Sequence, residues 1–262
     1  MQAAISNLDN FTIQTYTSFL LFLKRRYEII PFCRFSRRNR SFLVLRHDVH
    51  ASLDAALQMA EIEKKLGIAA TYTVFLFNRF YNLSNRDDLA LLLRIAKMGH
   101  EIGLHYDIEE YSNFRRPLQE TLLMEIKMLE RLVRRKLRTI AMHNPSSYKF
   151  DPFAHIPRYT NAYTFNKAHD VFYVSDSCRA WRIADIHNLI ANKPERVQLL
   201  IHPFHWIPSS QDRYSSLDRL FERIDKQNRE YKRQWKETWK RLPHVTRYDK
   251  EIRTSSRLLD FG

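Results

Sequence analysis

Histidines and carboxylates closely follow hydrophobic segments of the chain at five places. The five places hold Asp48 and His50, His105 and Asp107, His143 and Asn144, Asp176, and His202. Together, imidazoles and carboxylates suit zinc or another first-row divalent metal that is held by three ligands with one position open. Such a metal lowers the pKa of a bound water and polarises a carbonyl group. A nearby carboxylate can then accept a proton, and a histidine opposite can protonate a leaving group.

Cysteine and glycine usage excludes several other chemistries. The 262-residue chain has two cysteines, too few for a cysteine zinc site and without the pattern of a disulfide framework. It has only four glycines, and no glycine-rich nucleotide-binding loop or hydrolase nucleophile elbow fits their positions. Two of them, Gly99 and Gly103, enclose one short segment, where we expect a helix stop at Gly99 and a close backbone approach at Gly103.

The elements that must position these side chains alternate between strand and helix. Hydrophobic runs predict strands at 41–46, 69–77, 101–105, 137–142, 171–174 and 197–201. Helices are predicted at 11–26, from a Ser52 cap to Gly67, from an Asp87 cap to Met98, and at 117–136. This alternation predicts an α/β fold with a parallel sheet or barrel, whose functional side chains lie at the carboxyl ends of the strands.

The pattern changes after about residue 208. We therefore predict a barrel over 1–208 and a basic, amphipathic helical extension over 209–262 that packs on the barrel. One face of the extension carries apolar residues at helical spacing, namely Leu217, Leu220, Phe221, Ile224, Tyr231, Trp235 and Trp239. A stripe of this kind is usually a packing face, here against the barrel or a twin subunit, so a homodimer is one expectation. Nucleic-acid binding is disfavoured, because stacking aromatics normally use a groove or an exposed sheet.

The net charge of +14 is concentrated in three stretches, 24–40, 115–138 and 211–262. One interpretation of this charge is attraction to an anionic partner, such as nucleic acid, an acidic lipid surface or a phosphate-bearing substrate. Solvated helix faces of a basic protein explain the same pattern. The longest apolar runs are far too short for a membrane span. Positive charge follows the first apolar run instead of preceding it, so we expect no secretory signal and a cytoplasmic location.

Four segments carry a resemblance to a known family. They are Arg46-His47-Asp48-Val49-His50, Gly99-His100-Glu101-Ile102-Gly103-Leu104-His105-Tyr106-Asp107, Ser175-Asp176-Ser177 with Trp181, and Leu199-Leu200-Ile201-His202-Pro203. In this order they resemble the motifs of the polysaccharide deacetylase superfamily (carbohydrate esterase family 4), over about residues 11 to 206. The resemblance is greatest to its cytoplasmic branch with an Arg-His-Asp-Val-Asp first motif. It implies a distorted, usually seven-stranded β/α barrel.

The resemblance also implies roles for the first two motifs. It makes Asp48 the catalytic base and His105 the first metal-binding histidine. The family's metal-binding carboxylate, two residues after the base, is replaced by His50. Imidazole can still bind the metal, but the site loses one negative charge.

The resemblance leaves the third metal ligand open, because Glu109 occupies the position of the family's second metal-binding histidine. Asp107, Glu109 and His143 compete for this place, and we favour His143 because it is an imidazole at a strand end. Against this choice, His143-Asn144-Pro145 falls where the family has an arginine-and-proline motif that orients the base. The implied metal is zinc, with cobalt or nickel as alternatives.

The resemblance makes His202 the catalytic acid and Asp176 the carboxylate that pairs with it. A carboxylate beside an imidazole raises its pKa and keeps a proton available for a departing amine. The residues expected to contact substrate are Asp107, Asn144, Trp181, His205 and Trp206.

Other polar residues are expected to be structural. His47 faces away from Asp48 by strand alternation, and His100 lies at a strand start, at the opposite end of the barrel from the site. Glu61 and Glu63 are expected to be ordinary helix-surface charges.

Together, these features predict a metal-dependent hydrolase of C–N bonds that deacetylates an N-acylated amino sugar in polysaccharide metabolism. A nucleotide- or lipid-linked sugar is the expected substrate. The first alternative is a pseudoenzyme that binds a glycan or partner, motivated by His50 and Glu109. The second is a binder of nucleic acid or acidic membranes through the basic C-terminal helix.

Overall fold

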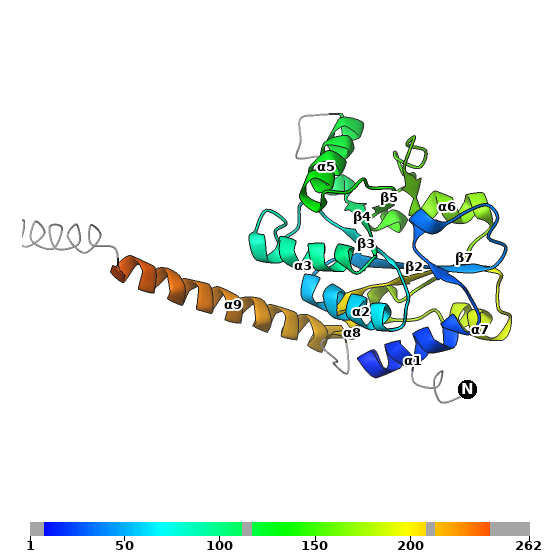
Figure 1. The fold of residues 1–262 in the computed structure, drawn as a ribbon, viewed down its shortest axis with the longest axis horizontal. Coiled ribbons are helices and arrows are strands. Elements are labelled where there is room, and N and C mark those ends of the chain that lie inside the picture. Colours follow the sequence, from blue (N-terminus) through cyan, green and yellow to red (C-terminus); the bar gives the residue numbers. More distant parts are fainter. Residues whose placement is uncertain (1–7, 112–116, 208–212, 242–262) are drawn as a thin grey trace, which may run out of the picture. The chain divides into compact units, whose positions relative to one another are not determined.

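The computed structural model describes residues 8–111, 117–207 and 213–241 of the chain. Its sheet has the strand order β6-β5-β4-β3-β2-β8-β7, with β1 paired to β2 outside this path, and each pair is parallel. The strands are β1 (Ile29–Ile30), β2 (Phe42–Val49), β3 (Thr71–Val74), β4 (Glu101–Tyr106), β5 (Thr139–Met142), β6 (Thr160–Asn161), β7 (Phe172–Ser175) and β8 (Arg196–Ile201). Seven of them form a curled half-barrel surrounded by helices (Figure 1). The predicted α/β barrel-like fold of about seven parallel strands is confirmed.

Most of the helices lie between successive strands, and several of them pack on the sheet, including α2 on β2, α5 on β4 and α7 on β7. The α-helices are α1 (Ile13–Lys24), α2 (Leu53–Lys65), α3 (Arg86–Lys97), α4 (Ile108–Tyr111), α5 (Leu118–Val133), α6 (Ala162–His169), α7 (Ile183–Ala191), α8 (Pro203–Trp206) and α9 (Arg213–Arg241). Short 3-10 turns lie at Phe32–Arg34 (η2), Pro145–Ser147 (η3) and Ser177–Arg179 (η4).

Local capping agrees with the predicted helix limits at one end and differs at another. The Ser52 side chain accepts a hydrogen bond from the backbone N–H of Ala55, as predicted for an N-cap. The N-cap of α3 is Asn85, two residues before the predicted cap at Asp87. The Asn85 side chain accepts a hydrogen bond from the backbone N–H of Asp87. Asp87 is therefore a first-turn acidic residue, which favours the positive end of the helix dipole.

Strand β2 is central to the placement of the site. All eight of its residues are buried, which is typical of a parallel strand covered on both faces. Its register pairs Asp48 with Thr73 of β3 and His47 with Ile201 of β8. The carboxyl ends of β2, β3 and β8 are thereby aligned.

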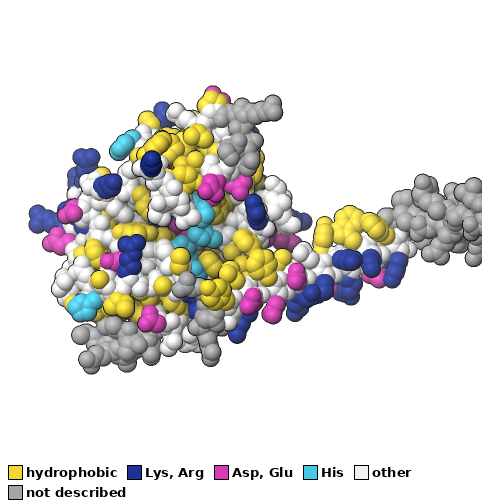
Figure 2. Space-filling model, turned by 180° about the vertical axis from the view of Figure 1, so that it is seen from behind, with side chains coloured by type: hydrophobic (Ala, Val, Ile, Leu, Met, Phe, Trp, Pro, Cys, Tyr) yellow, Lys and Arg dark blue, Asp and Glu magenta, His cyan; other side chains and the backbone are white. Residues whose placement is uncertain are grey.

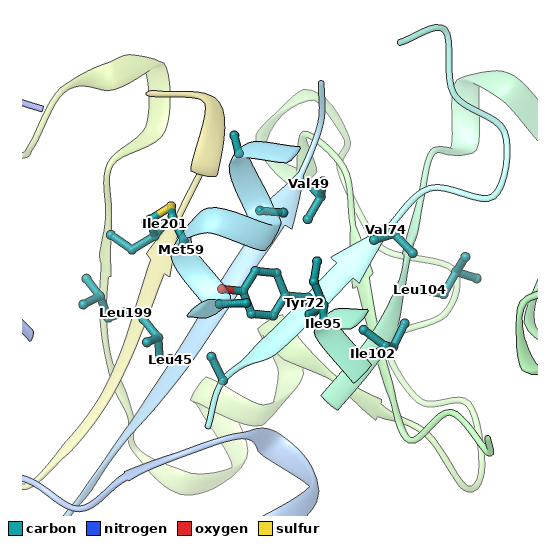
Figure 3. Packing of buried hydrophobic residues seen from close by; sticks show 14 of the residues in the cluster. Leu45, Val49, Met59, Tyr72, Val74, Ile95, Ile102, Leu104, Leu199 and Ile201 are labelled. Carbon is teal, nitrogen blue, oxygen red and sulfur yellow. The ribbon is translucent and has the colours of Figure 1, made fainter. Parts of the chain in front are cut away.

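The main hydrophobic core lies between the sheet and its helices. Figure 3 shows side chains from β2, β3, β4 and β8 meeting side chains of α2 and α3. The labelled residues are Leu45, Val49, Met59, Tyr72, Val74, Ile95, Ile102, Leu104, Leu199 and Ile201. Because this packing fixes the strands, it also fixes the positions of the polar residues that follow them.

The expectation that Glu63 is a surface charge is wrong. Glu63 is fully buried in the core, where it accepts hydrogen bonds from the hydroxyls of Tyr16 (2.5 Å) and Tyr72 (3.0 Å). His47 Nε2 lies 2.7 Å from Glu63 Oε1, and His100 Nδ1 lies 3.4 Å from Oε2. Burial alone would raise the pKa of Glu63, but the facing His47 outweighs it and lowers the pKa. His47 and His100 thus belong to a buried network of the core, in keeping with the structural role predicted for them.

The C-terminal part of the described chain is one long helix. The chain separates into two compact units, Met1–Ser216 and Leu217–Gly262. The boundary at 208/209 and the packing of the extension on the barrel stay predictions. Within the residues that the structure describes, we find no helix with the length and apolar character needed to cross a bilayer.

Candidate active site

Four histidine rings come together beyond the carboxyl ends of the strands. His50 follows β2, and its ring centroid lies 5.1 Å from His105 of β4, 5.0 Å from His143 after β5 and 4.8 Å from His202 after β8. Figure 2 shows histidine side chains gathered on the face seen there, with hydrophobic and acidic side chains around them. The clustering expected from the sequence is therefore present, because the parallel register aligns the strand ends.

Asp48 is held rigidly by its neighbours on β2 and β3. Arg46 donates to both of its carboxylate oxygens, from Nε at 2.7 Å and from Nη2 at 2.6 Å, and Thr73 Oγ1 donates to Oδ1 at 2.6 Å. Arg46 is also anchored by a hydrogen bond from Nη2 to the Tyr163 hydroxyl at 3.1 Å. Burial alone would raise the pKa of Asp48, but the Arg46 guanidinium outweighs it and holds the pKa well below its usual range. Asp48 is therefore an oriented carboxylate.

His105 presents one nitrogen as a potential metal ligand. Its Nδ1 donates to the Ala141 carbonyl at 2.9 Å, which leaves the lone pair on Nε2. That Nε2 lies 3.0 Å from Nε2 of His50 and 3.6 Å from Asp48 Oδ2. Burial lowers the pKa of His105 to about 4, and burial with the neighbouring His202 holds the pKa of His50 well below its usual range. Both rings are thus neutral near pH 7, the form that binds metals.

These three residues fit a metal ion. One ligand atom each from Asp48, His50 and His105 lies within 4.8 Å of the others. Two nitrogen ligands at about 2.0–2.1 Å from one tetrahedral zinc lie about 3.3–3.4 Å apart. The 3.0 Å between the Nε2 atoms of His50 and His105 is close to that separation. The same distance fits an N–H···N hydrogen bond between the two neutral imidazoles, and both of these nitrogens are potential metal ligands.

The three candidates for a further ligand are placed differently. His143 Nδ1 donates to Asp107 Oδ2 at 2.7 Å, so its Nε2 keeps a lone pair and Asp107 orients the ring. Its ring adjoins His50 and His105, but it lies outside the compact group that they form with Asp48. Glu109 is exposed and lies beside Tyr148. Asp107 thus supports the His143 ring, and Glu109 contacts Tyr148. His143 as third ligand stays a prediction.

On the other side of the cluster, Asp176 holds His202. Asp176 Oδ1 accepts from His202 Nδ1 at 2.6 Å, and the backbone N–H of His202 donates to both carboxylate oxygens. Burial alone would lower the pKa of His202, but the Asp176 carboxylate outweighs it and raises the pKa. This orientation leaves Nε2 as the nitrogen that can give or take a proton.

The three remaining aromatic and imidazole residues lie deeper than expected. Trp206 has no exposed surface, and its indole N–H donates to Asp176 Oδ2 at 2.8 Å. Trp181 is 8% exposed and donates to the Leu8 carbonyl. His205 is 6% exposed, and its carbonyl accepts from Arg179. The expected substrate contact of Trp206 is therefore not seen: its ring fills the core and its N–H fixes Asp176.

Asp176, His202 and His205 also form a compact group of potential ligand atoms. The Asp176 oxygens already accept from His202 and Trp206. We therefore interpret this group as a hydrogen-bonded acid–base pair with its support.

A pocket of about 450 Å³ adjoins the histidines. It is lined by His50, Phe75, Phe77, Asn78, Arg79, Phe80, Asp107, Glu110 and His143. Asn78 donates to the His50 carbonyl at 2.9 Å, which fixes the backbone at that ligand. Asn144 is exposed beside His143, at a positive φ of 49°.

The sequence analysis assigned no role to Arg46, although it stands in the first motif, and it missed Thr73 and the aromatic wall formed by Phe75, Phe77 and Phe80. A signal for the wall was present, since Phe75 and Phe77 lie at the carboxyl end of the strand predicted over 69–77 and Phe80 follows it. Thr73 gave no such signal, because a threonine inside a strand is ordinary.

The fold and site together define an α/β half-barrel with an imidazole–carboxylate cluster at the carboxyl ends of its strands. No family model matches the sequence, and no curated protein matches it either. In fold, the chain is similar to a carbohydrate esterase family 4 pseudoenzyme from Bacillus anthracis, at 17% identity and a TM-score of 0.41, covering 72% of this chain and 62% of that one. This chain thus spans less than two thirds of the length of that protein.

Two further structures, of enzymes, are also similar in fold. A family 4 acetyl xylan esterase from Clostridium thermocellum, in complex with cobalt, is 12% identical with a TM-score of 0.41, covering 71% of this chain and 84% of that one. A peptidoglycan deacetylase from Bacillus subtilis is 17% identical with a TM-score of 0.40, covering 75% and 98%.

Proposed function

We propose that the protein is a metal-dependent hydrolase that removes an acyl group from the nitrogen of an N-acylated amino sugar. The observation that carries the proposal is the group of Asp48, His50 and His105 facing the Asp176–His202 pair across one cluster. Metal ligands, a carboxylate and a proton donor are the parts that amide hydrolysis needs.

The metal would be held by His50 and His105, with His143 as third ligand. Zinc suits this set, and cobalt or nickel suits it also. When bound, the metal supplies an activated water and polarises the amide carbonyl. The chain contributes the orientation of its ligands, through the Ala141 carbonyl behind His105 and the Asp107 carboxylate behind His143.

Asp48 accepts the proton of the attacking water in this proposal. Arg46 and Thr73 fix its position, and Oδ2 faces His105 Nε2 at 3.6 Å. The same Arg46 fork weakens Asp48 as a base, because a base works best when its pKa is near the working pH. Orientation next to the water is therefore what Asp48 offers, more than intrinsic basicity.

His202 protonates the leaving nitrogen. Its pKa is raised by Asp176, so a larger fraction carries the proton at neutral pH than in free histidine. Trp206 supports the pair by donating a hydrogen bond from its indole N–H to Asp176. Asp107, Asn144 and His205 remain the proposed contacts for the sugar. The basic stretches suit a phosphate-bearing substrate, so a nucleotide- or lipid-linked amino sugar is the proposed substrate.

A second candidate function is a catalytically inactive binder of a glycan or a protein partner. The specific observation in its favour is that Arg46 occupies both oxygens of Asp48, while His50 stands in place of a carboxylate ligand. The site then offers a metal little negative charge, which lowers its affinity.

Metal analysis of the purified, zinc-reconstituted protein separates the two candidates. Binding of about one equivalent, with acetate release from N-acetylglucosamine oligosaccharides, supports the hydrolase. Binding below about 0.1 equivalent overturns it.

The roles are tested with variants. We expect His105→Ala to lose the metal, and Asp48→Asn to retain it without turnover. His187→Ala, an exposed histidine on α7, is the matched control and should behave as wild type. Because Asp48→Asn leaves buried Arg46 with a weaker partner, folding is checked by circular dichroism, and His202→Gln gives an independent loss of turnover. Turnover in Asp48→Asn would contradict its role, and loss of metal there would make Asp48 a ligand.

A further inference from the structure

The distal half of α9 combines an aromatic stripe with a high positive charge. Tyr231, Trp235 and Trp239 are spaced four residues apart, so they lie on one face of the helix. Residues 226–241 hold seven Lys and Arg and two Glu, a net charge of +5. The proximal residues 213–225 hold three of each sign and are neutral. Both tryptophans of the helix and its excess charge therefore lie in the same half.

The aromatic stripe is exposed. Tyr231 is 62% exposed, Trp235 46% and Trp239 55%. Their rings contact each other along the helix, with centroids 6.1 Å apart for Tyr231–Trp235 and 6.0 Å for Trp235–Trp239. Figure 2 shows hydrophobic side chains along one edge of this helix and basic side chains along another. A row of large aromatic side chains that is exposed to solvent marks an interaction site.

The basic side chains lie beside and behind this stripe. Lys232 and Lys236 are next to it on the helix surface, and Arg233 and Lys240 lie farther round. Arg233 pairs with Glu230, and Lys240 with Glu237. The two acidic residues of this half are thus already neutralised, and the excess charge of +5 remains for an external partner.

We propose that the distal half of α9 binds the surface of an anionic lipid bilayer, lying in the interfacial plane. Tryptophan and tyrosine suit the headgroup level, because each has an apolar ring and a polar N–H or O–H. A basic amphipathic helix of low overall hydropathy is the form that binds there without spanning the bilayer. Charge complementarity with anionic headgroups adds to the apolar contact.

A second copy of the chain is a poorer occupant. Pairing two stripes would bring two segments of +5 side by side, which is unfavourable at ordinary ionic strength. Nucleic acid would use the charge but not the stripe, because aromatics on the side of a helix offer bases no groove in which to stack. The bilayer is the partner that uses both features, and it does so independently of the hydrolase activity proposed above.

The test is vesicle binding by the full chain. Vesicles of phosphatidylcholine with about one third phosphatidylglycerol are compared with pure phosphatidylcholine in sedimentation assays. We expect binding to the anionic vesicles only, weakened as salt is raised from about 50 to about 500 mM. The chain has four tryptophans, of which Trp181 and Trp206 are buried. A blue shift of tryptophan emission, with quenching by brominated lipid, would therefore report on Trp235 and Trp239.

Two double variants separate the contributions. Trp235→Ala/Trp239→Ala should weaken binding about tenfold or more, and Lys232→Ala/Lys236→Ala should do the same at low salt. Alanine favours the helix, so circular dichroism should show no loss of helicity.

The matched control removes exposed apolar side chains elsewhere. Phe150→Ala/Ile183→Ala deletes residues that are 75% and 84% exposed, and it should bind vesicles as wild type does. Absence of binding to anionic vesicles at low salt overturns the proposal, as does full binding by the tryptophan variant. A dimer in sedimentation equilibrium that the tryptophan variant dissociates, without vesicle binding, would assign the stripe to a second copy instead.

Discussion

Replacing Gly103 by alanine should destabilise the protein and disturb its site at the same time. Gly103 lies in β4, and a Cβ added there would be 2.8 Å from the Thr139 carbonyl oxygen and 3.1 Å from Thr73 Cγ2. An ordinary carbon–oxygen contact is about 3.3–3.6 Å, so β4 and β5 must separate by about 0.5 Å. Overpacking of this kind costs about 1–3 kcal/mol, offset by about 0.4–1 kcal/mol from the smaller entropy of the unfolded chain.

The expected net loss is about 1–2 kcal/mol, which for a domain of this size lowers Tm by about 2–8 °C. Thr73 also donates to Asp48, so pressure on Thr73 should reduce any turnover. The control is Gly99→Ala: Gly99 has φ +100°, and a Cβ there has no atom within 4 Å. It should lower stability through backbone strain alone and leave the site intact. Urea and thermal denaturation measure both, and a Gly103→Ala variant as stable as wild type would refute the reasoning.

Two further predictions concern buried carboxylates. Glu63→Ala leaves the buried hydroxyls of Tyr16 and Tyr72 without their acceptor and should lower the free energy of unfolding by about 2–5 kcal/mol in urea titrations; a change below about 0.5 kcal/mol would contradict the network. Burial raises the pKa of Glu125, beside the Tyr111 hydroxyl, to about 7. Its stabilising contribution is therefore complete below about pH 4.5 and is lost as pH rises through about 7, roughly 3 kcal/mol in all. Glu125→Gln should flatten this part of the stability–pH curve, and an unchanged curve would contradict the assignment.

The sequence allowed the elements and the general place of the site to be predicted. Apolar runs followed by Asp48, His105 and His202 marked strand ends, and parallel strands must align those ends. Element limits were less accurate: the strand predicted over 69–77 has only Thr71–Val74 in the ladder, because apolar composition does not show where a partner strand ends. The residues beyond it instead form the aromatic wall of the pocket.

Other features were hidden because they depend on which element packs where. Glu63 follows a helix pattern that alone suggests a surface position, and only the approach of Tyr16, His47 and Tyr72 shows that it is a buried acceptor. Trp206 was expected in a cleft, but α8 turns its ring into the core.

By itself, the sequence determined the alternation of strand and helix, the residue types available for chemistry and the scarcity of glycine that drew attention to Gly103. These are local properties, set by apolar spacing and side-chain chemistry. Only the tertiary structure decided that Arg46 would lock Asp48, that Nε2 of His50 would face Nε2 of His105, and that Asp107 would stand behind His143. Those relations depend on strand register and side-chain direction, which arise when segments far apart in the chain pack together.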